Sequence, residues 1–200
     1  GLNVAVGDDA GYLMTTGVQN TLIGALAGDA LTTGSSNIAV GYQALTTDTA
    51  GSRSVAVGFS ALRFQANTSS VETYNVAVGH AAGEAVTTGQ YNTIIGGLAG
   101  DALTTGGNNT VVGQEALTTE DVGTHSVAIG FKALGLQNTA SAGITYNTGV
   151  GVYTGYYNVT GTANTILGYQ AGFGASGQSN SSNTFIGYNA AYGITTGGSN

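Results

Sequence analysis

The sequence predicts an all-β solenoid of stacked parallel strands, with about 17 residues in each coil. One five-residue phrase, an opening Asn or Ser followed by a short apolar run and a glycine, occurs eleven times in the 200 residues. Successive openings are 17, 17, 17, 21, 17, 17, 17, 21, 17 and 19 residues apart. A fixed short period is typical of chains that stack one supersecondary unit on the next. The openings are Asn3, Asn20, Asn37, Ser54, Asn75, Asn92, Asn109, Ser126, Asn147, Asn164 and Asn183.

Aligned on this opening, which we number position 1, a repeat reads N-x-φ-φ-G-x-x-A-x-x-x-x-T-T-G-x-x, where φ is apolar. The β-branched residues before the first glycine predict a strand of about four or five residues. The second glycine predicts a tight turn, since glycine reaches positive φ without strain. Stacked at ~4.8 Å, eleven coils give a rod roughly 50 Å long, and the recurring Asn side chains predict a hydrogen-bonded ladder along it.

Residues 1–200 are expected to form a single repeat domain. Neither end resembles the polar cap that a solenoid needs for solubility, so we interpret the chain as a segment of a longer fibre.

Three repeats lack the turn glycine, and the same three carry the extra residues. They predict longer turns near residues 64–73, 136–145 and 174–182. Loops on a rigid scaffold often carry recognition, and passive spacers are the alternative. The candidate contact residues in these turns are Asn67, Ser69, Ser70, Glu72, Asn138, Ser141, Ser176, Gln178 and Asn180.

A second regularity concerns positions 2 and 3. Where position 2 is Val or Ile, position 3 is Ala, and where position 2 is Thr, position 3 is usually larger. Position 4 is always Val, Ile or Leu, and adjacent strand residues point to opposite faces, so we expect positions 2 and 4 to face the core of the coil. Position 3 would then form an outward apolar stripe that contacts other copies in a symmetric oligomer. This expected inter-chain stripe comprises Leu22, Ile94, Val111, Ile166 and Phe185.

Composition excludes several function classes. The net charge is −7 and the only certain cations are Arg53, Arg63 and Lys132, so no basic surface for nucleic acid is expected. Without cysteine, disulfides and thiolate metal sites are excluded, and no apolar run is long enough to insert into a membrane.

No arrangement of residues predicts catalysis, a metal site or a cofactor. His80 and His125 lie in different repeats, and the spacing around Asp8 and Asp9 matches no calcium loop. We therefore expect the chain not to be an enzyme.

Two other surfaces have more than one interpretation. The aromatic residues after the first glycine could stack on a sugar or, as we favour, on one another; they are Tyr42, Phe59, Phe131, Tyr169 and Tyr188. The Thr pairs before the turn glycine, such as Thr15–Thr16 and Thr32–Thr33, suggest ice binding as a minor alternative, although only one Thr of each pair could line a given face.

The phrases SVAVG and SVAIG, each with Ala three residues after the glycine, resemble the head repeats of trimeric autotransporter adhesins, the YadA-like heads. The form NTILGYQA, with NTFIGYNA, is similar to repeats of bacteriophage tail fibres. This resemblance covers essentially the whole chain and implies a left-handed parallel β-roll, three chains around a common axis and a role in surface attachment. The adhesin repeat is usually a few residues shorter than 17, so coil width and partner are open.

These observations together lead to one functional hypothesis and its alternatives. We expect a non-enzymatic, homotrimeric fibre segment, extracellular on a cell surface or in a virion tail fibre, that attaches to a host or other surface through a glycan or protein. The main alternative is a purely structural spacer or filament subunit that has no receptor. An ice-binding solenoid is the minor alternative.

Overall fold

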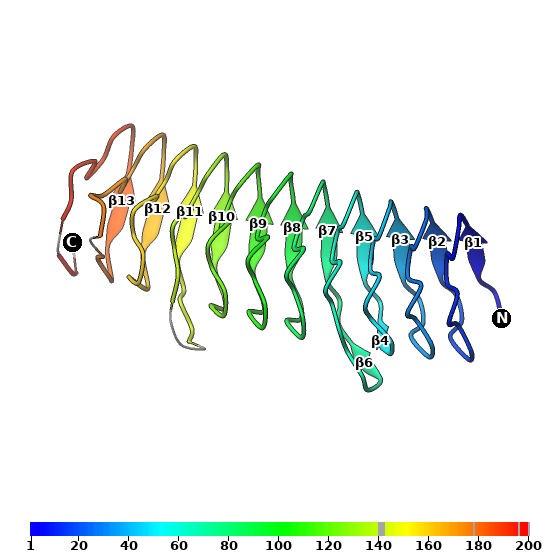
Figure 1. Ribbon diagram of the computed structural model, residues 1–200. Helices are drawn as coiled ribbons and strands as arrows, with labels where there is room; N and C mark the ends of the chain where they lie inside the picture. Colours follow the sequence, from blue (N-terminus) through cyan, green and yellow to red (C-terminus); the bar gives the residue numbers. More distant parts are fainter. Residues whose placement is uncertain (140–142, 178, 196, 200) are drawn as a thin grey trace.

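The computed structural model describes residues 1–139, 143–177, 179–195 and 197–199, and within these ranges the chain is a parallel β-solenoid with no helix (Figure 1). Eleven three-residue strands form one sheet, each hydrogen-bonded to the next coil. This confirms the predicted all-β solenoid of about eleven turns with roughly 17 residues each. The strands of the sheet are β1 (Val4–Val6), β2 (Thr21–Ile23), β3 (Ile38–Val40), β5 (Val55–Val57), β7 (Val76–Val78), β8 (Thr93–Ile95), β9 (Thr110–Val112), β10 (Val127–Ile129), β11 (Thr148–Val150), β12 (Thr165–Leu167) and β13 (Thr184–Ile186).

The longer turns leave the register of this sheet unchanged. Val55 pairs with Val76 across the first 21-residue coil, and Val127 pairs with Thr148 across the second. Equivalent repeat positions therefore still stack on each other, because the extra residues leave the rod at its turn edge. In the first longer turn, β6 (Val71–Glu72) forms a second parallel pair with β4 (Gly51–Ser52) of the preceding coil.

The core lies on the opposite face of the strand from the one predicted. Position 3 points into the coil, where it meets the small residue at position 8 and the apolar residues at positions 9 and 12. The predicted inter-chain stripe is therefore wrong: its residues are 0% to 7% exposed within a single chain. The residues concerned are Leu22, Ile94, Val111, Ile166 and Phe185. Positions 2 and 4 point outward instead.

The size variation at position 3 is compensated inside the core. A Cβ on Gly28, at position 9, would lie 2.9 Å from the Leu22 side chain of its own coil. A Cβ on Gly149 would lie 2.9 Å from Leu134, which extends from the preceding coil into the space of a position-3 side chain. Apolar volume is thus exchanged between positions 3 and 9 of stacked coils.

The first glycine of the repeat allows the corners to stack closely. Gly58 has a φ of 138°, and a Cβ there would lie 2.2 Å from the carbonyl oxygen of Gly79 in the next coil. A larger residue would push the coils apart, since real Cβ atoms do not approach backbone so closely.

The opening Asn residues form a hydrogen-bonded ladder, as predicted, but most of its bonds reach backbone. Asn37 Nδ2 donates to the carbonyl oxygen of Gly51 at 2.9 Å, and its Oδ1 accepts the N–H of Ser54 in the next coil at 2.9 Å. Direct amide-to-amide bonds occur at a few steps, such as Asn92 Nδ2 to Asn75 Oδ1 at 3.3 Å. Each buried Asn thus joins its own turn to the next coil.

Candidate functional site

A buried polar network anchors the first longer turn. Asp48 occupies position 12, is fully buried, and accepts the backbone N–H groups of Gly51 and Asn67 at 3.0 Å each. It also accepts a hydrogen bond from Gln65 Nε2. Gln65, at position 12 of the next coil, donates to Ser54 Oγ at 3.0 Å and accepts from Asn75 at 2.9 Å. The Gln65 amide thereby replaces the Asn that the Ser54 repeat lacks.

The second longer turn has the same network 72 residues later. Glu120 Oε1 accepts the N–H of Gly123 and the hydroxyl of Thr139, both at 2.8 Å. Gln137 Nε2 donates to Glu120 Oε2 at 2.9 Å and to Ser126 Oγ at 3.0 Å. Our sequence reasoning missed both networks.

A signal for these networks was present in the sequence. Position 12 is apolar in six of the eleven repeats, and it is polar only in the longer-turn repeats 54–74 and 126–146 and in the repeats that precede a longer turn. The six apolar residues are Met14, Leu31, Val86, Leu103, Ala175 and Ile194.

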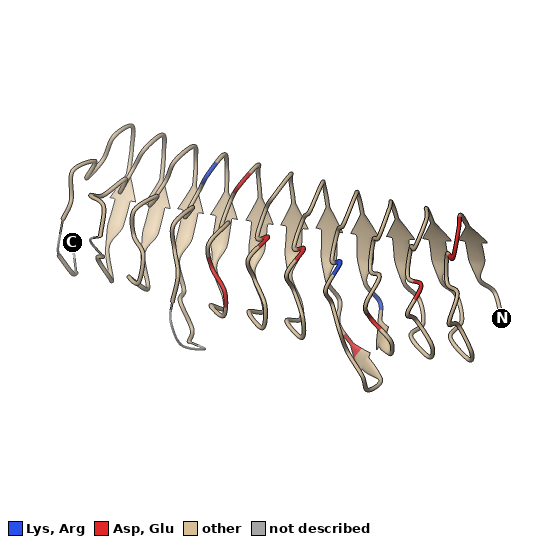
Figure 2. Ribbon diagram, in the orientation of Figure 1, with Lys and Arg blue, Asp and Glu red and all other residues tan. Residues whose placement is uncertain are grey.

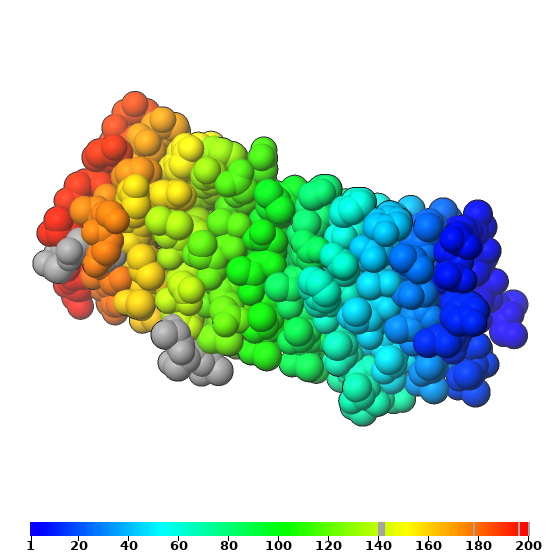
Figure 3. All heavy atoms as spheres, in the orientation of Figure 1, coloured from blue at the N-terminus to red at the C-terminus, as the bar shows by residue number. Residues whose placement is uncertain are grey.

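The structure divides the predicted contact residues into two groups. Asn67 and Asn180 are 6% and 3% exposed, so they anchor their turns and cannot serve as contact residues as predicted. Ser141 and Gln178 lie outside the described residues. The others are exposed: Ser69, Ser70, Glu72, Asn138 and Ser176. In Figure 3 the first longer turn stands out from the rod as a separate protrusion.

At the base of this protrusion three side chains form a closed set of contacts. Arg53 Nη2 lies 2.8 Å from Glu72 Oε1, and Arg53 Nη1 donates to the Tyr74 hydroxyl at 2.7 Å. The Tyr74 hydroxyl donates to Glu72 Oε2 at 2.9 Å, and the guanidinium carbon lies 5.4 Å from the Tyr74 ring centre. Arg53 and Glu72 are about half exposed, so part of each side chain is accessible from solvent.

Two hollows lie along this turn edge. The first has a volume of about 430 Å³, and its walls include Gln19, Ser36, Ser52, Arg53 and Glu72. The second has a volume of about 260 Å³, and its walls are formed by Thr88, Gln90, Tyr91, Thr105, Gly107, Asn108 and Thr124. Both hollows are polar surface depressions. The 430 Å³ hollow lies beside the longer turn at residues 64–73, and the 260 Å³ hollow lies one coil before the longer turn at residues 136–145.

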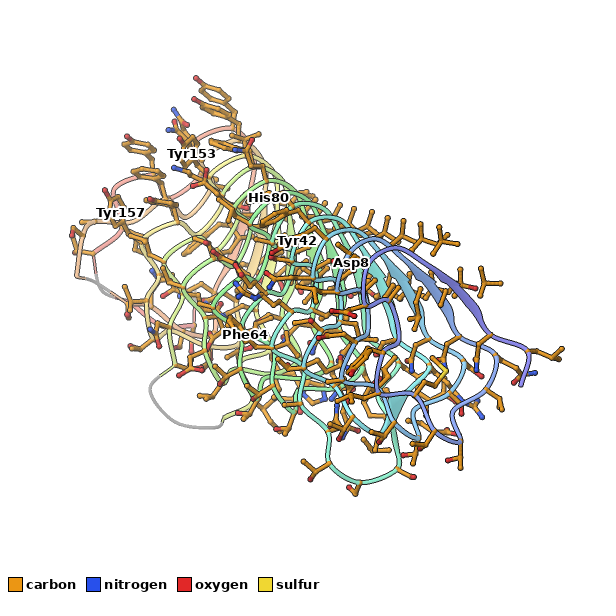
Figure 4. The ribbon with its side chains drawn as sticks, turned by 45° about the vertical axis from the view of Figure 1, so that its right-hand side comes forward. Asp8, Tyr42, Phe64, His80, Tyr153 and Tyr157 are labelled. Atoms are coloured by element: carbon orange, nitrogen blue, oxygen red, sulfur yellow. The ribbon has the colours of Figure 1, made fainter. Side chains whose placement is uncertain are left out.

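The aromatic residues form stacked columns. The ring centres of Tyr42 and Phe59 are 5.3 Å apart, and those of Phe59 and His80 are 5.2 Å apart. Tyr169 and Tyr188 also stack, whereas Phe131 meets Tyr153 edge-on. The stacking of neighbouring rings on one another favours the ladder over a sugar platform. Figure 4 shows the projecting rings near the C-terminal end.

The two Thr residues of a pair differ in their surroundings. The first hydroxyl of a pair donates to a carbonyl of the next coil, as Thr15 does to Thr32 and Thr32 to Thr49. The second Thr of these pairs, such as Thr16 and Thr33, is exposed, so ice binding stays a minor alternative.

The outward strand face is a continuous uncharged surface. Its residues, at positions 2 and 4 of every coil, are all Val, Ile, Leu or Thr. Ile23 and Ile95 are each 39% exposed, and Ile186 is 64% exposed. The charged residues are outside the strands of the main sheet (Figure 2).

All three cations are paired with glutamate: Arg53 with Glu72, Arg63 with Glu84 and Lys132 with Glu115. The hydrogen bond to Glu115 raises the pKa of Lys132, and burial raises the pKa of Asp101 although the Thr118 hydroxyl opposes this shift. Within the described ranges no group of His, Cys, Asp and Glu is arranged to hold a metal ion, and no helix could cross a membrane.

Comparisons with protein-family models, with curated proteins and with solved structures found no match to this chain.

Proposed function

We propose that this chain is a segment of a homotrimeric, non-enzymatic extracellular fibre that attaches a bacterium or a phage to a surface. The resemblance of its repeats to adhesin heads and tail fibres supports this role and a left-handed β-roll. The observation that carries the proposal is the outward strand face, which is continuous and uncharged along the rod.

The length of this face and its lack of charge support burial between chains. Eleven strands at ~4.8 Å give a length of about 50 Å, and two side-chain rows give a width of roughly 10 Å. The resulting ~500 Å² lies within the range of the largest apolar patches on monomers, so the argument for burial rests on the continuity of this face and its lack of charge. A threefold axis parallel to the rod lets each copy present the same face to its two neighbours, and this arrangement closes without forming an open filament.

The assembly is tested by measuring the mass of the chain in solution by light scattering during gel filtration. We expect a trimer for the wild-type chain and a folded monomer for Ile95→Asp, because Ile95 lies in the middle of the exposed face. Thr88→Asp, on the exposed turn edge, is the matched control and should remain trimeric. A stable wild-type monomer would contradict the proposal.

The spacer alternative is favoured by the unbroken hydrogen-bonded stacking of the coils. Binding of the fluorescent chain to host cells separates the two functions. An attachment segment should lose binding when residues 66–73 and 138–145 are shortened, whereas equal binding by both forms would support the spacer.

A further inference from the structure

We propose that the first hollow is a binding site for a neutral carbohydrate, and that the second hollow is a modified copy of the same site. This inference rests on the attachment role proposed above and gives it a ligand class.

The first argument is that the two hollows occupy equivalent places. Their shared wall positions are exactly one 72-residue unit apart in the numbering: Gln19 with Tyr91, Ser35 with Gly107, Ser36 with Asn108 and Ser52 with Thr124. Four coils separate them, which corresponds to about 19 Å along the rod. The first hollow borders a longer turn and the second ends one coil before one, and a buried carboxylate anchors each of these turns. A hollow that recurs with its supporting network indicates a repeated site.

The second argument concerns the charges in the first hollow. Its charged wall residues are one guanidinium, Arg53, and one carboxylate, Glu72, which lie 2.8 Å apart and are half exposed. Glu72 would repel an anionic ligand and Arg53 would repel a cationic one, so this pair favours a ligand without net charge. Adjacent sugar hydroxyls suit the pair, because one can donate to the carboxylate while the other accepts from the guanidinium.

The third argument is that the other walls can bond hydroxyl groups. Ser52 Oγ accepts the N–H of Ser35 at 3.0 Å, which leaves its own O–H as a donor. Ser36 and Gln19 meet only at 3.4 Å, a long contact that a ligand could replace. The volume of about 430 Å³ falls within the range of small-molecule sites, roughly 300–1,000 Å³.

The site is also held in place before a ligand arrives. Glu72 belongs to β6, which pairs with β4 beside Ser52 and Arg53. The Asp48 network fixes the start of the same turn through the N–H of Asn67. Such preorganisation lowers the entropy lost on binding.

The second hollow differs in ways that predict weaker binding. It is smaller, at about 260 Å³, and the residue equivalent to Glu72 is Ile144. Asn108, Thr124 and the Tyr91 hydroxyl retain uncharged polar groups in its walls.

The experiment is saturation-transfer NMR on the whole 200-residue chain. Lactose, cellotriose and mannotriose are the neutral probes, and 3′-sialyllactose is the anionic probe. We expect transfer to at least one neutral probe, with about tenfold weaker binding in Glu72→Gln because a bond to a charged acceptor is lost. Glu84→Gln, which changes the other Arg–Glu pair, is the matched control and should bind like the wild-type chain.

Blocking variants locate the binding. Ser36 precedes a repeat opening, a position where Tyr74 and Tyr91 are accommodated with positive φ, so Ser36→Tyr should fold while filling the first hollow. Asn108→Tyr fills the second hollow. Ala163→Tyr is the control, because Ala163 has the same repeat position but lines neither hollow. We expect Ser36→Tyr to remove most of the transfer and the Ser36→Tyr/Asn108→Tyr double variant to remove all of it.

Three results would overturn the inference: no transfer to any neutral probe, transfer that persists in the double variant, or binding of the sialylated probe alone. These outcomes are independent of assembly. A monomer that binds sugar would refute only the trimer, and a trimer that gives no transfer would refute only the carbohydrate site.

Discussion

Replacing Asp48 by leucine tests whether a buried carboxylate holds the first longer turn. The substitution removes the acceptor for the N–H groups of Gly51 and Asn67 and for the Gln65 amide. Each buried donor left without a partner costs about 1–3 kcal/mol. Burial of the new leucine stabilises the fold by about 2 kcal/mol, since Leu31 and Leu103 are buried at this repeat position in other coils. The expected net loss is about 4 kcal/mol.

The assay must be local, because a solenoid can open in parts and a single unfolding midpoint can miss this. Hydrogen exchange followed by mass spectrometry on peptides from residues 48–75 meets this need. A loss of about 4 kcal/mol predicts exchange faster by roughly a thousandfold, since each 1.4 kcal/mol is a factor of ten. Peptides from the C-terminal coils should exchange as in the wild-type chain.

Two further variants make the result interpretable. Asp48→Asn keeps one acceptor oxygen and should lose less protection than Asp48→Leu. Asp8→Leu changes an exposed aspartate in the column that holds Tyr42 and Phe59, and it should have little effect. If Asp48→Leu leaves protection of residues 48–75 unchanged, the carboxylate does not anchor the turn and the reasoning fails.

Two other predictions follow from the core and from a pKa shift. Gly149→Ile should lower the free energy of unfolding, measured in urea, by about 1–3 kcal/mol because the new side chain meets Leu134. Adding Leu134→Gly should recover much of this loss. Additive losses in the double variant would show that the two side chains do not share one space. Burial raises the pKa of Asp101 above 3.8 in the folded chain, so ionisation disfavours folding and stability falls as pH rises from about 3.8 through the raised pKa. Asp101→Asn should therefore be more stable than the wild-type chain at pH 7 and no more stable near pH 3, and an equal difference at both pH values would rule out the raised pKa as its cause.

The sequence was sufficient to predict the coils and their register. Each of these depends on spacing alone, and the pairing of Val55 with Val76 across the extra residues confirms that logic. The buried face is ambiguous in repeats such as Val4–Val6, where all three strand residues are apolar, but Thr at position 2 of six repeats was a signal that this face points outward. Position 3 packs against positions 8 and 9, such as Ala44 and Leu45, which lie outside the strand. A pattern limited to the three strand residues does not include these contacts.

The contact residues show a different limit. Asn67 and Ser69 lie in the same polar turn, yet one is buried and the other exposed. The difference arises from Asp48, which is 19 residues earlier and in another coil. Local composition cannot distinguish the two, whereas a comparison of position 12 across all repeats identifies the coils where the core becomes polar.

This polar substitution also bears on the choice between a spacer and an attachment segment. A coil of a plain spacer needs only an apolar residue at position 12 and a turn glycine, as the repeat containing Leu31 and Gly34 shows. Burying a carboxylate costs several kcal/mol unless every acceptor site is satisfied. The chain nevertheless places one at Asp48 and again at Glu120, with a matching glutamine each time. The two networks hold longer turns that add no strand to the main sheet. They therefore stabilise the turns and not the stacking of the coils, which favours recognition at the turns.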